Sequence, residues 1–112
     1  MSVTPFTEKV IQIILEIPRG KVMTYGQIAG FAGNPRAARQ VVRILHAMSQ
    51  KYGLPWYRVI NAKGKIALRS DKGFNEQKML LEQEGVEVDI NGNIDLAKYH
   101  WRPEPNETPY SY

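Results

Sequence analysis

Apolar residues recur at helical spacing near the start of the chain. One face of a helix predicted over residues 4–17 carries Phe6, Val10, Ile13, Ile14 and Ile17. Thr4 suits the N-cap, and Pro5 suits the first turn, where its missing N–H costs nothing. Pro18 and Gly20 end the pattern. We expect this apolar face to be part of the core.

A second, shorter helix is predicted from a capping box. Thr24 and Gln27 have the required spacing, with Thr24 as the N-cap and the Gln27 side chain reaching back to it. The helix then runs to about Ala32, and Gly33 ends it.

A longer helix follows directly. Asn34 is predicted to cap it, Pro35 opens it, and it runs to about Gln50. Its buried side is formed by Val41, Val42, Leu45 and Met48. Its polar, basic side is formed by Arg36, Arg39, Gln40 and Arg43. Two helices joined by a tight glycine turn, the second basic and exposed, are typical of a helix-turn-helix.

Extended segments are predicted in the second half of the chain. Residues 57–61 and 65–68 are short and apolar, and a turn at 63–64 joins them. Apolar residues alternate with acids over 86–90, and an Asn-Gly turn then leads into residues 94–96. This pattern predicts a β-hairpin.

Between these extended segments, one more helix is predicted over residues 75–84. Asn75 is its predicted N-cap, and Gly85 stops it. Met79 and Leu80 are expected to point inward.

These elements make a mainly α fold with small β elements. We see no internal repeat and no linker long enough to divide the chain, so residues 1–102 are expected to be a single domain. Residues 103–112 are rich in proline and acids and are predicted to be a disordered tail.

Charge is unevenly distributed along the 112 residues. The net charge is +4, but residues 18–72 carry +10 and residues 73–112 carry −5. A segment this basic favours a polyanionic partner such as nucleic acid. A solvated basic face without a partner is the alternative.

Composition excludes several kinds of site. The chain has no cysteine, so it has no disulfide, thiolate metal site or cysteine nucleophile. His46 and His100 are far apart in the sequence, so we expect no metal and no cofactor. The apolar run over residues 10–17 is interrupted by Gln12 and Glu16 and is too short to span a membrane. A cytoplasmic, monomeric protein is expected.

Four segments in order resemble the DNA-binding domain of O6-alkylguanine-DNA alkyltransferases. They are residues 24–29 (TYGQIA), 33–41 (GNPRAARQV), 55–61 (PWYRVIN) and 80–85 (LLEQEG), and the resemblance covers about residues 5–90. It implies a winged helix-turn-helix that binds DNA.

One departure from these enzymes changes the expected activity. The alkyltransferases carry Pro-Cys-His-Arg-Val, in which the cysteine accepts the alkyl group, whereas here Trp56 and Tyr57 stand at the cysteine and histidine positions. An indole cannot replace a thiolate nucleophile, so the protein is predicted not to be an enzyme. The tryptophan is similar to that of the alkyltransferase-like proteins, which bind O6-alkylguanine without repairing it.

The resemblance therefore implies a non-enzymatic damage sensor. It would dock in the minor groove of duplex DNA containing O6-alkylguanine, flip the base and channel the lesion to nucleotide-excision repair proteins. In a bacterium it would be nucleoid-associated when bound. The alternatives are a helix-turn-helix protein that reads sequence, or an enzyme such as a glycosylase, for which Asp71 is the one acid near the expected pocket.

Residue roles follow from the same resemblance. Arg39 matches the arginine finger that fills the space of the flipped nucleotide, and Tyr25 matches the tyrosine that presses on the adjacent phosphate. The expected DNA-binding residues are Tyr25, Arg36, Ala38, Arg39, Gln40 and Arg43. The expected lesion pocket consists of Trp56, Tyr57, Val59, Arg69 and Ser70. Arg58 and Glu84 are expected to form a structural pair.

Overall fold

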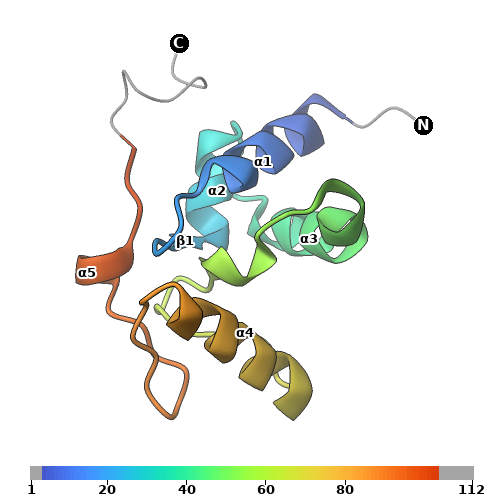
Figure 1. Cartoon of the computed structure of the whole chain (residues 1–112). Helices are drawn as coiled ribbons and strands as arrows, with labels where there is room; N and C mark the ends of the chain where they lie inside the picture. Colours follow the sequence, from blue (N-terminus) through green and yellow to red (C-terminus); the bar gives the residue numbers. More distant parts are fainter. Residues whose placement is uncertain (1–3, 104–112) are drawn as a thin grey trace.

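Helices dominate residues 4–103, the part of the chain that the computed structural model describes. The elements are α1 (Pro5–Glu16), β1 (Met23–Thr24), α2 (Tyr25–Phe31), α3 (Ala38–Tyr52), the 3-10 helix η1 (Trp56–Arg58), β2 (Val59–Ile60), α4 (Asp71–Gln83) and α5 (Leu96–Tyr99). α1, α2 and α3 pack against one another, and α4 packs against η1. Figure 1 shows α4 on the opposite side of η1 from α1. Of the tail predicted to be disordered, residues 104–112 lie outside the described residues.

Local capping signals set the starts of α1 and α2, as predicted. The Thr4 hydroxyl accepts a hydrogen bond from the Thr7 amide at 3.2 Å, and Pro5 occupies the first turn. The Thr24 hydroxyl accepts from the Gln27 amide at 3.1 Å, while the Gln27 side chain accepts from the Thr24 amide at 3.4 Å. The capping box is therefore confirmed.

The start of α3 differs from the prediction. Asn34 does not cap a helix that opens at Pro35, because its side chain instead accepts from the Arg36 amide within a separate turn. The helix begins at Ala38, and its N-cap, Ala37, makes no side-chain hydrogen bond. A short asparagine side chain can close a local turn as easily as it caps a helix, so the sequence signal was ambiguous.

α4 also begins earlier than predicted. Ser70, not Asn75, is its N-cap, and the Ser70 hydroxyl accepts from the Gly73 amide at 3.1 Å. The inward residues of α4 are Gln77 and Leu81, whereas Met79 is half exposed, so the prediction for Met79 was wrong.

Of the predicted β-hairpin only the turn forms: the Asp89 amide donates to the Asn93 carbonyl at 3.1 Å, but residues 86–90 are not a strand. The Asp89 carboxylate accepts from the amides of Asn91 and Asn93 and closes a loop. Residues 92–94 pair instead with residues 64–66, where the Ile94 amide donates to the Gly64 carbonyl at 2.8 Å. One apolar side chain from each segment, Ile66 and Ile94, is buried in this arrangement.

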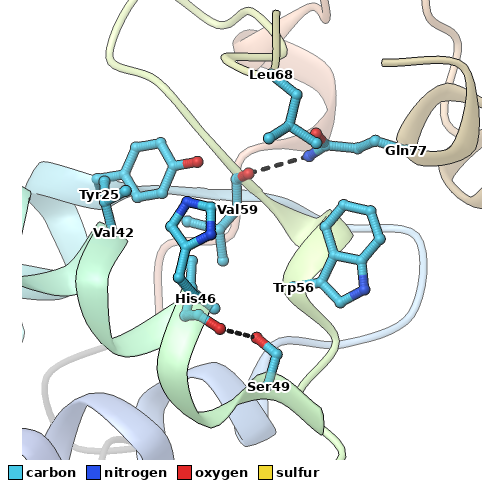
Figure 2. Close-up of a pocket in the computed structure, with 9 residues that line it drawn as sticks. Tyr25, Val42, His46, Ser49, Trp56, Val59, Leu68 and Gln77 are labelled. Atoms are coloured by element: carbon cyan, nitrogen blue, oxygen red, sulfur yellow. Dashed lines mark hydrogen bonds between the residues drawn. The ribbon is translucent and has the colours of Figure 1, made fainter. Parts of the chain in front are cut away.

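β1 and β2 are two-residue parallel strands that bring distant parts of the chain together. Met23 pairs with Val59, and Thr24 pairs with Ile60. Of the segment predicted to be extended over residues 57–61, only Val59–Ile60 is a strand; Trp56–Arg58 is helical. The 3-10 helix η1 comes directly before β2. Its first residue, Trp56, lies beside a pocket bordered by α3 (Figure 2).

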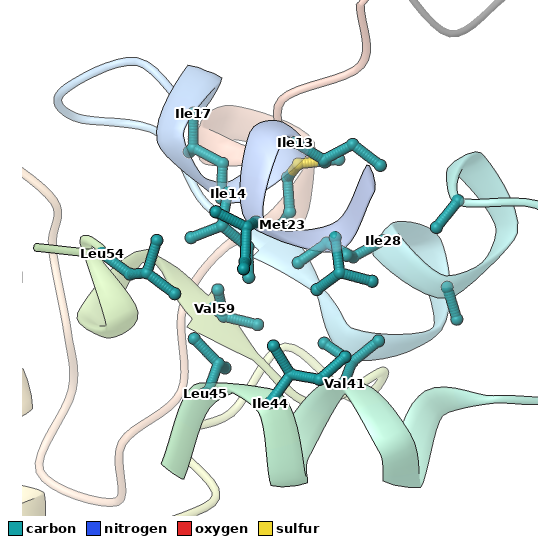
Figure 3. Packing of buried hydrophobic residues seen from close by; sticks show 14 of the residues in the cluster. Ile13, Ile14, Ile17, Met23, Ile28, Val41, Ile44, Leu45, Leu54 and Val59 are labelled. Atoms are coloured by element: carbon teal, nitrogen blue, oxygen red, sulfur yellow. The ribbon is translucent and has the colours of Figure 1, made fainter. Parts of the chain in front are cut away.

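Two hydrophobic clusters hold these elements together. In the first, Figure 3 shows Ile13 and Ile14 of α1 with the following Ile17 on one side and Val41, Ile44 and Leu45 of α3 on the other, with Met23, Ile28 and Val59 between them. The second cluster lies against α4 and consists of Val22, Ile60, Ile66, Leu81, Val86, Val88, Ile94 and Tyr99. The first cluster fixes the inner face of α3 and so orients its outer face.

Candidate functional site

The outer face of α3 is basic. Arg39, Gln40 and Arg43 are exposed on the side of the helix away from the core, and Arg36 is exposed in the preceding turn. Arg39 and Arg43 are one helical turn apart and therefore share one side of α3. Ala38 is half-buried at the first position of the helix. The structure thus brings the predicted DNA-binding residues of this segment to one region.

A pocket of about 260 Å³ lies against α3. Its lining comes from α2, α3, η1, β2, the loop before α4 and α4 itself: Tyr25, Val42, Leu45, His46, Ser49, Trp56, Val59, Leu68 and Gln77. The walls are mostly apolar, which is typical of sites for small organic groups.

Three aromatic rings border the open space of this pocket. Figure 2 shows the rings of Tyr25, His46 and Trp56 around it. Tyr25 is the first residue of α2, and burial raises the pKa of its hydroxyl above the ordinary value. The phenol therefore stays protonated at neutral pH and can donate a hydrogen bond.

Only part of the predicted pocket lines the cavity. Trp56 and Val59 do, but Tyr57, Arg69 and Ser70 are absent from its lining. Successive residues of a 3-10 helix point about a third of a turn apart, so Trp56 and Tyr57 face different sides of η1.

The three residues absent from the pocket lining have other positions in the structure. The Tyr57 hydroxyl donates to the Glu84 carboxylate at 3.0 Å, and its ring makes an edge contact with Trp56 at 5.9 Å between centroids. Ser70 caps α4, and Arg69 is exposed in the loop before it.

Sequence reasoning missed several residues of the pocket, including His46 and Gln77. The available signal was the spacing of Val42 and His46, which places both on one side of the predicted helix. Gln77 offered no signal, because its position depends on how α4 packs. Its side-chain nitrogen donates to the carbonyls of Tyr57 at 3.0 Å and Val59 at 3.1 Å.

Outside the lining of the pocket, Arg58 and Glu84 form the expected ion pair. The shortest contact, from an Arg58 terminal nitrogen to Glu84 Oε2, is 2.6 Å, and only 2% of the Glu84 side chain is exposed. Glu84 also accepts from the Gly20 amide at 2.9 Å and from Tyr57. Gly20 has a φ of +83° and a Cβ there would approach the Glu84 carbonyl, so a glycine suits this position.

The charge state of this network is well defined. Burial alone would raise the pKa of the Glu84 carboxyl, but the hydrogen bonds from Arg58, the Gly20 amide and Tyr57 hold that pKa below its ordinary value. Burial and the bond to Glu84 raise the pKa of Tyr57. Glu84 is therefore a carboxylate that accepts from its neighbours, which suits a structural role.

Neither a metal site nor a membrane-spanning segment is found among residues 4–103. No group of three or more His, Asp or Glu side chains there is arranged to hold a metal ion. No helix in that part of the chain has the length and apolar character needed to cross a bilayer.

Comparison with known proteins gives a consistent result. Residues 5–86 match the family described as the DNA-binding domain of 6-O-methylguanine DNA methyltransferase. A DNA base-flipping protein of Vibrio parahaemolyticus is 46% identical over 98 residues, covering 88% of this chain and 97% of the relative. Alkyltransferase-like protein 1 of Schizosaccharomyces pombe is 40% identical over 108 residues, covering 92% of this chain and all of the relative.

A solved structure extends the likeness to three dimensions. The S. pombe alkyltransferase-like protein, in complex with damaged DNA containing O6-carboxymethylguanine, superposes with a TM-score of 0.81. The match has 40% sequence identity and covers 92% of this chain and 100% of that one. It confirms the fold class predicted from the sequence, a mainly helical winged helix-turn-helix.

Proposed function

Since the chain belongs to the family of the 6-O-methylguanine DNA methyltransferase DNA-binding domain, as an alkyltransferase-like member, we propose that it binds O6-alkylguanine in duplex DNA and flips that base into the pocket beside α3. The observation that carries the proposal is the position of this pocket. Tyr25, Trp56 and Val59 line it, and it borders the helix that bears Arg39 and Arg43. A base leaving the duplex at α3 would have only a short path to the pocket.

In this proposal α3 enters the minor groove. Arg39 occupies the space left by the flipped nucleotide, while Arg36, Gln40 and Arg43 contact the backbone and groove. Unstacking a base costs a few kcal/mol, and a planar guanidinium that stacks and hydrogen-bonds offsets part of that cost. The small side chain of Ala38 lets the start of α3 approach the groove closely.

The pocket then holds the flipped base. Trp56 gives an apolar wall for the base or its substituent, and Tyr25 presses on the neighbouring phosphate. Arg69 is exposed and adjacent in sequence to Leu68, whose side chain lines the pocket. From there its guanidinium covers the face of the purine, a contact worth up to about 2 kcal/mol.

We further propose that the protein acts as a sensor, not as an enzyme. The chain has no cysteine, and Trp56 stands where the alkyltransferases carry the acceptor. A bound lesion therefore keeps its alkyl group and must be removed by other proteins. In this proposal the protein hands the lesion to nucleotide-excision repair. It acts in the cytoplasm as a monomer, and its residues 1–102 form one domain.

A binding titration tests this proposal. One duplex sequence is prepared with guanine, O6-methylguanine or O6-carboxymethylguanine, with the O6 substituent labelled. We expect tighter binding to both lesions than to guanine, with all label remaining on the DNA. Stoichiometric label on the protein would show an enzyme, and affinity that follows the flanking bases in place of the lesion would show a sequence reader.

A further inference from the structure

His46 has no role in the function described so far, yet it projects into the pocket. Val42 and His46 are one turn apart on α3, and both line the cavity. Figure 2 shows the His46 ring on the α3 side of the open space, between the rings of Tyr25 and Trp56. The imidazole therefore faces the space that a flipped base and its substituent would fill.

The polar groups of the pocket differ in their remaining hydrogen-bonding capacity. The Ser49 hydroxyl already donates to the Leu45 carbonyl. The Gln77 side-chain nitrogen already donates to the carbonyls of Tyr57 and Val59, and the side chain is 2% exposed, so only its oxygen is left. Among residues 4–103, no hydrogen bond joins the His46 ring to another residue, and His46 is exposed where it lines the pocket. His46 and Tyr25 are thus the side chains from α2 and α3 that can still donate into the pocket.

The charges around the pocket favour the binding of a negatively charged hydrogen-bond acceptor. Among the described residues that line it, there is no carboxylate. Arg43 lies one turn before His46 on the same helix, and its side chain is exposed. An anionic group in the pocket would therefore meet donors and no acid.

We propose that His46 is a specificity-determining residue that recognises oxygen-bearing O6 substituents. An imidazole N–H donates to the carboxylate of O6-carboxymethylguanine, whereas the methyl group of O6-methylguanine offers no acceptor. His46 thus selects among lesions that the apolar walls alone would accept equally. This inference rests on the proposed base flipping into the same pocket.

Variants at His46 test the inference on the three duplexes of the titration above. His46→Leu removes the donor but keeps an apolar side chain, and His46→Gln keeps a donor. Gln50→Ala is the matched control, because Gln50 is exposed on the same helix and does not line the pocket. Circular dichroism checks that each variant is folded.

We expect His46→Leu to weaken binding of the carboxymethyl duplex about tenfold while leaving the methyl and guanine duplexes unchanged. This is the loss expected for one hydrogen bond to a charged group. His46→Gln should recover part of the loss, and Gln50→Ala should match the unmodified protein.

The outcomes separate the inference from the function on which it rests. Equal weakening of all three duplexes by His46→Leu would place His46 on the DNA backbone and overturn the inference. An unchanged ratio between the two lesions would overturn it as well. If the unmodified protein binds neither lesion better than guanine, the proposed function itself fails.

Discussion

Glu84 accepts hydrogen bonds from two separate parts of the chain while its side chain is almost fully buried. Its partners are Arg58, Tyr57 and the Gly20 amide. Arg58 also donates to the Ile17 carbonyl at 2.8 Å, so the network links the end of α1, the following turn, η1 and α4. The network is therefore structural.

Removing the Glu84 charge should therefore destabilise the fold. Glu84→Gln leaves the Arg58 guanidinium largely buried without its counter-charge, for which we expect a loss of about 3 kcal/mol in the free energy of unfolding. Urea denaturation measures this loss. Glu82→Gln is the control, because Glu82 forms an exposed pair with Lys78 worth only about 0.5 kcal/mol. Similar losses for the two variants would contradict the structural role.

The same carboxylate predicts a dependence of stability on pH. The pKa of Glu84 in the folded state lies below its ordinary value of 4.5, so the unfolded chain takes up a proton first as the pH falls. The stabilisation by this group is complete above the unfolded pKa and is lost as the pH falls through the lower folded pKa. Unfolding curves should show this loss below about pH 4.5 in the unmodified protein. Glu84→Gln should lack that component.

At the scale of elements, α3 and the loop before α4 have different positions relative to the pocket. α3 is fixed by its inner residues, including Ile44, and presents Arg39 outward. The loop ends at Ser70, which caps α4, and leaves Arg69 exposed. In the proposed mechanism Arg39 acts while the base leaves the duplex, and Arg69 acts once it is in the pocket.

Alanine variants of these two arginines should therefore fail differently. Arg39→Ala is expected to weaken binding to alkylated and unmodified duplex alike, and to leave a fluorescent base analogue beside the lesion more stacked. Arg69→Ala is expected to spare binding to unmodified duplex and to lower the preference for the lesion about tenfold, as the loss of one cation–π contact implies. Lys51→Ala, in the last turn of α3, is the control. If Arg69→Ala keeps the full preference for the lesion over guanine, the aromatic side chains of the pocket alone recognise the base.

At the scale of the whole molecule, charge divides along the chain. Residues 18–72 carry a net charge of +10 and include all of α3, η1 and β2, while residues 73–112 carry −5. The basic part holds most of the residues that line the pocket. DNA should therefore approach the molecule from the side of α3.

This distribution predicts a strong dependence of DNA binding on salt. The logarithm of affinity should fall with the logarithm of salt concentration by roughly 0.9 for each phosphate neutralised. A titration of unmodified duplex at several salt concentrations measures the slope. The ratio of affinities for lesion and guanine should change much less, because the pocket lining is mostly apolar. Salt-independent binding would show that the basic segment is merely solvated.

Local signals were sufficient for several features that depend on residues close in the sequence, although not for the starts of α3 and α4. The cap at Thr4, the capping box of Thr24 and Gln27, and the helix-turn-helix were predictable because their hydrogen bonds form within one turn. The family motifs also indicated the Arg58–Glu84 pair. The absence of cysteine could likewise be read directly from the sequence.

Tertiary packing decided the features that depend on distant segments. The pairing of residues 92–94 with residues 64–66 joins segments separated by α4, so no local pattern could indicate it. The pocket is assembled from elements that are far apart in the sequence, so no local pattern indicates that His46 and Gln77 line it while Tyr57 turns toward Glu84. Side-chain direction on a short helix such as η1 follows from the surfaces packed against it, and these exist only in the folded chain.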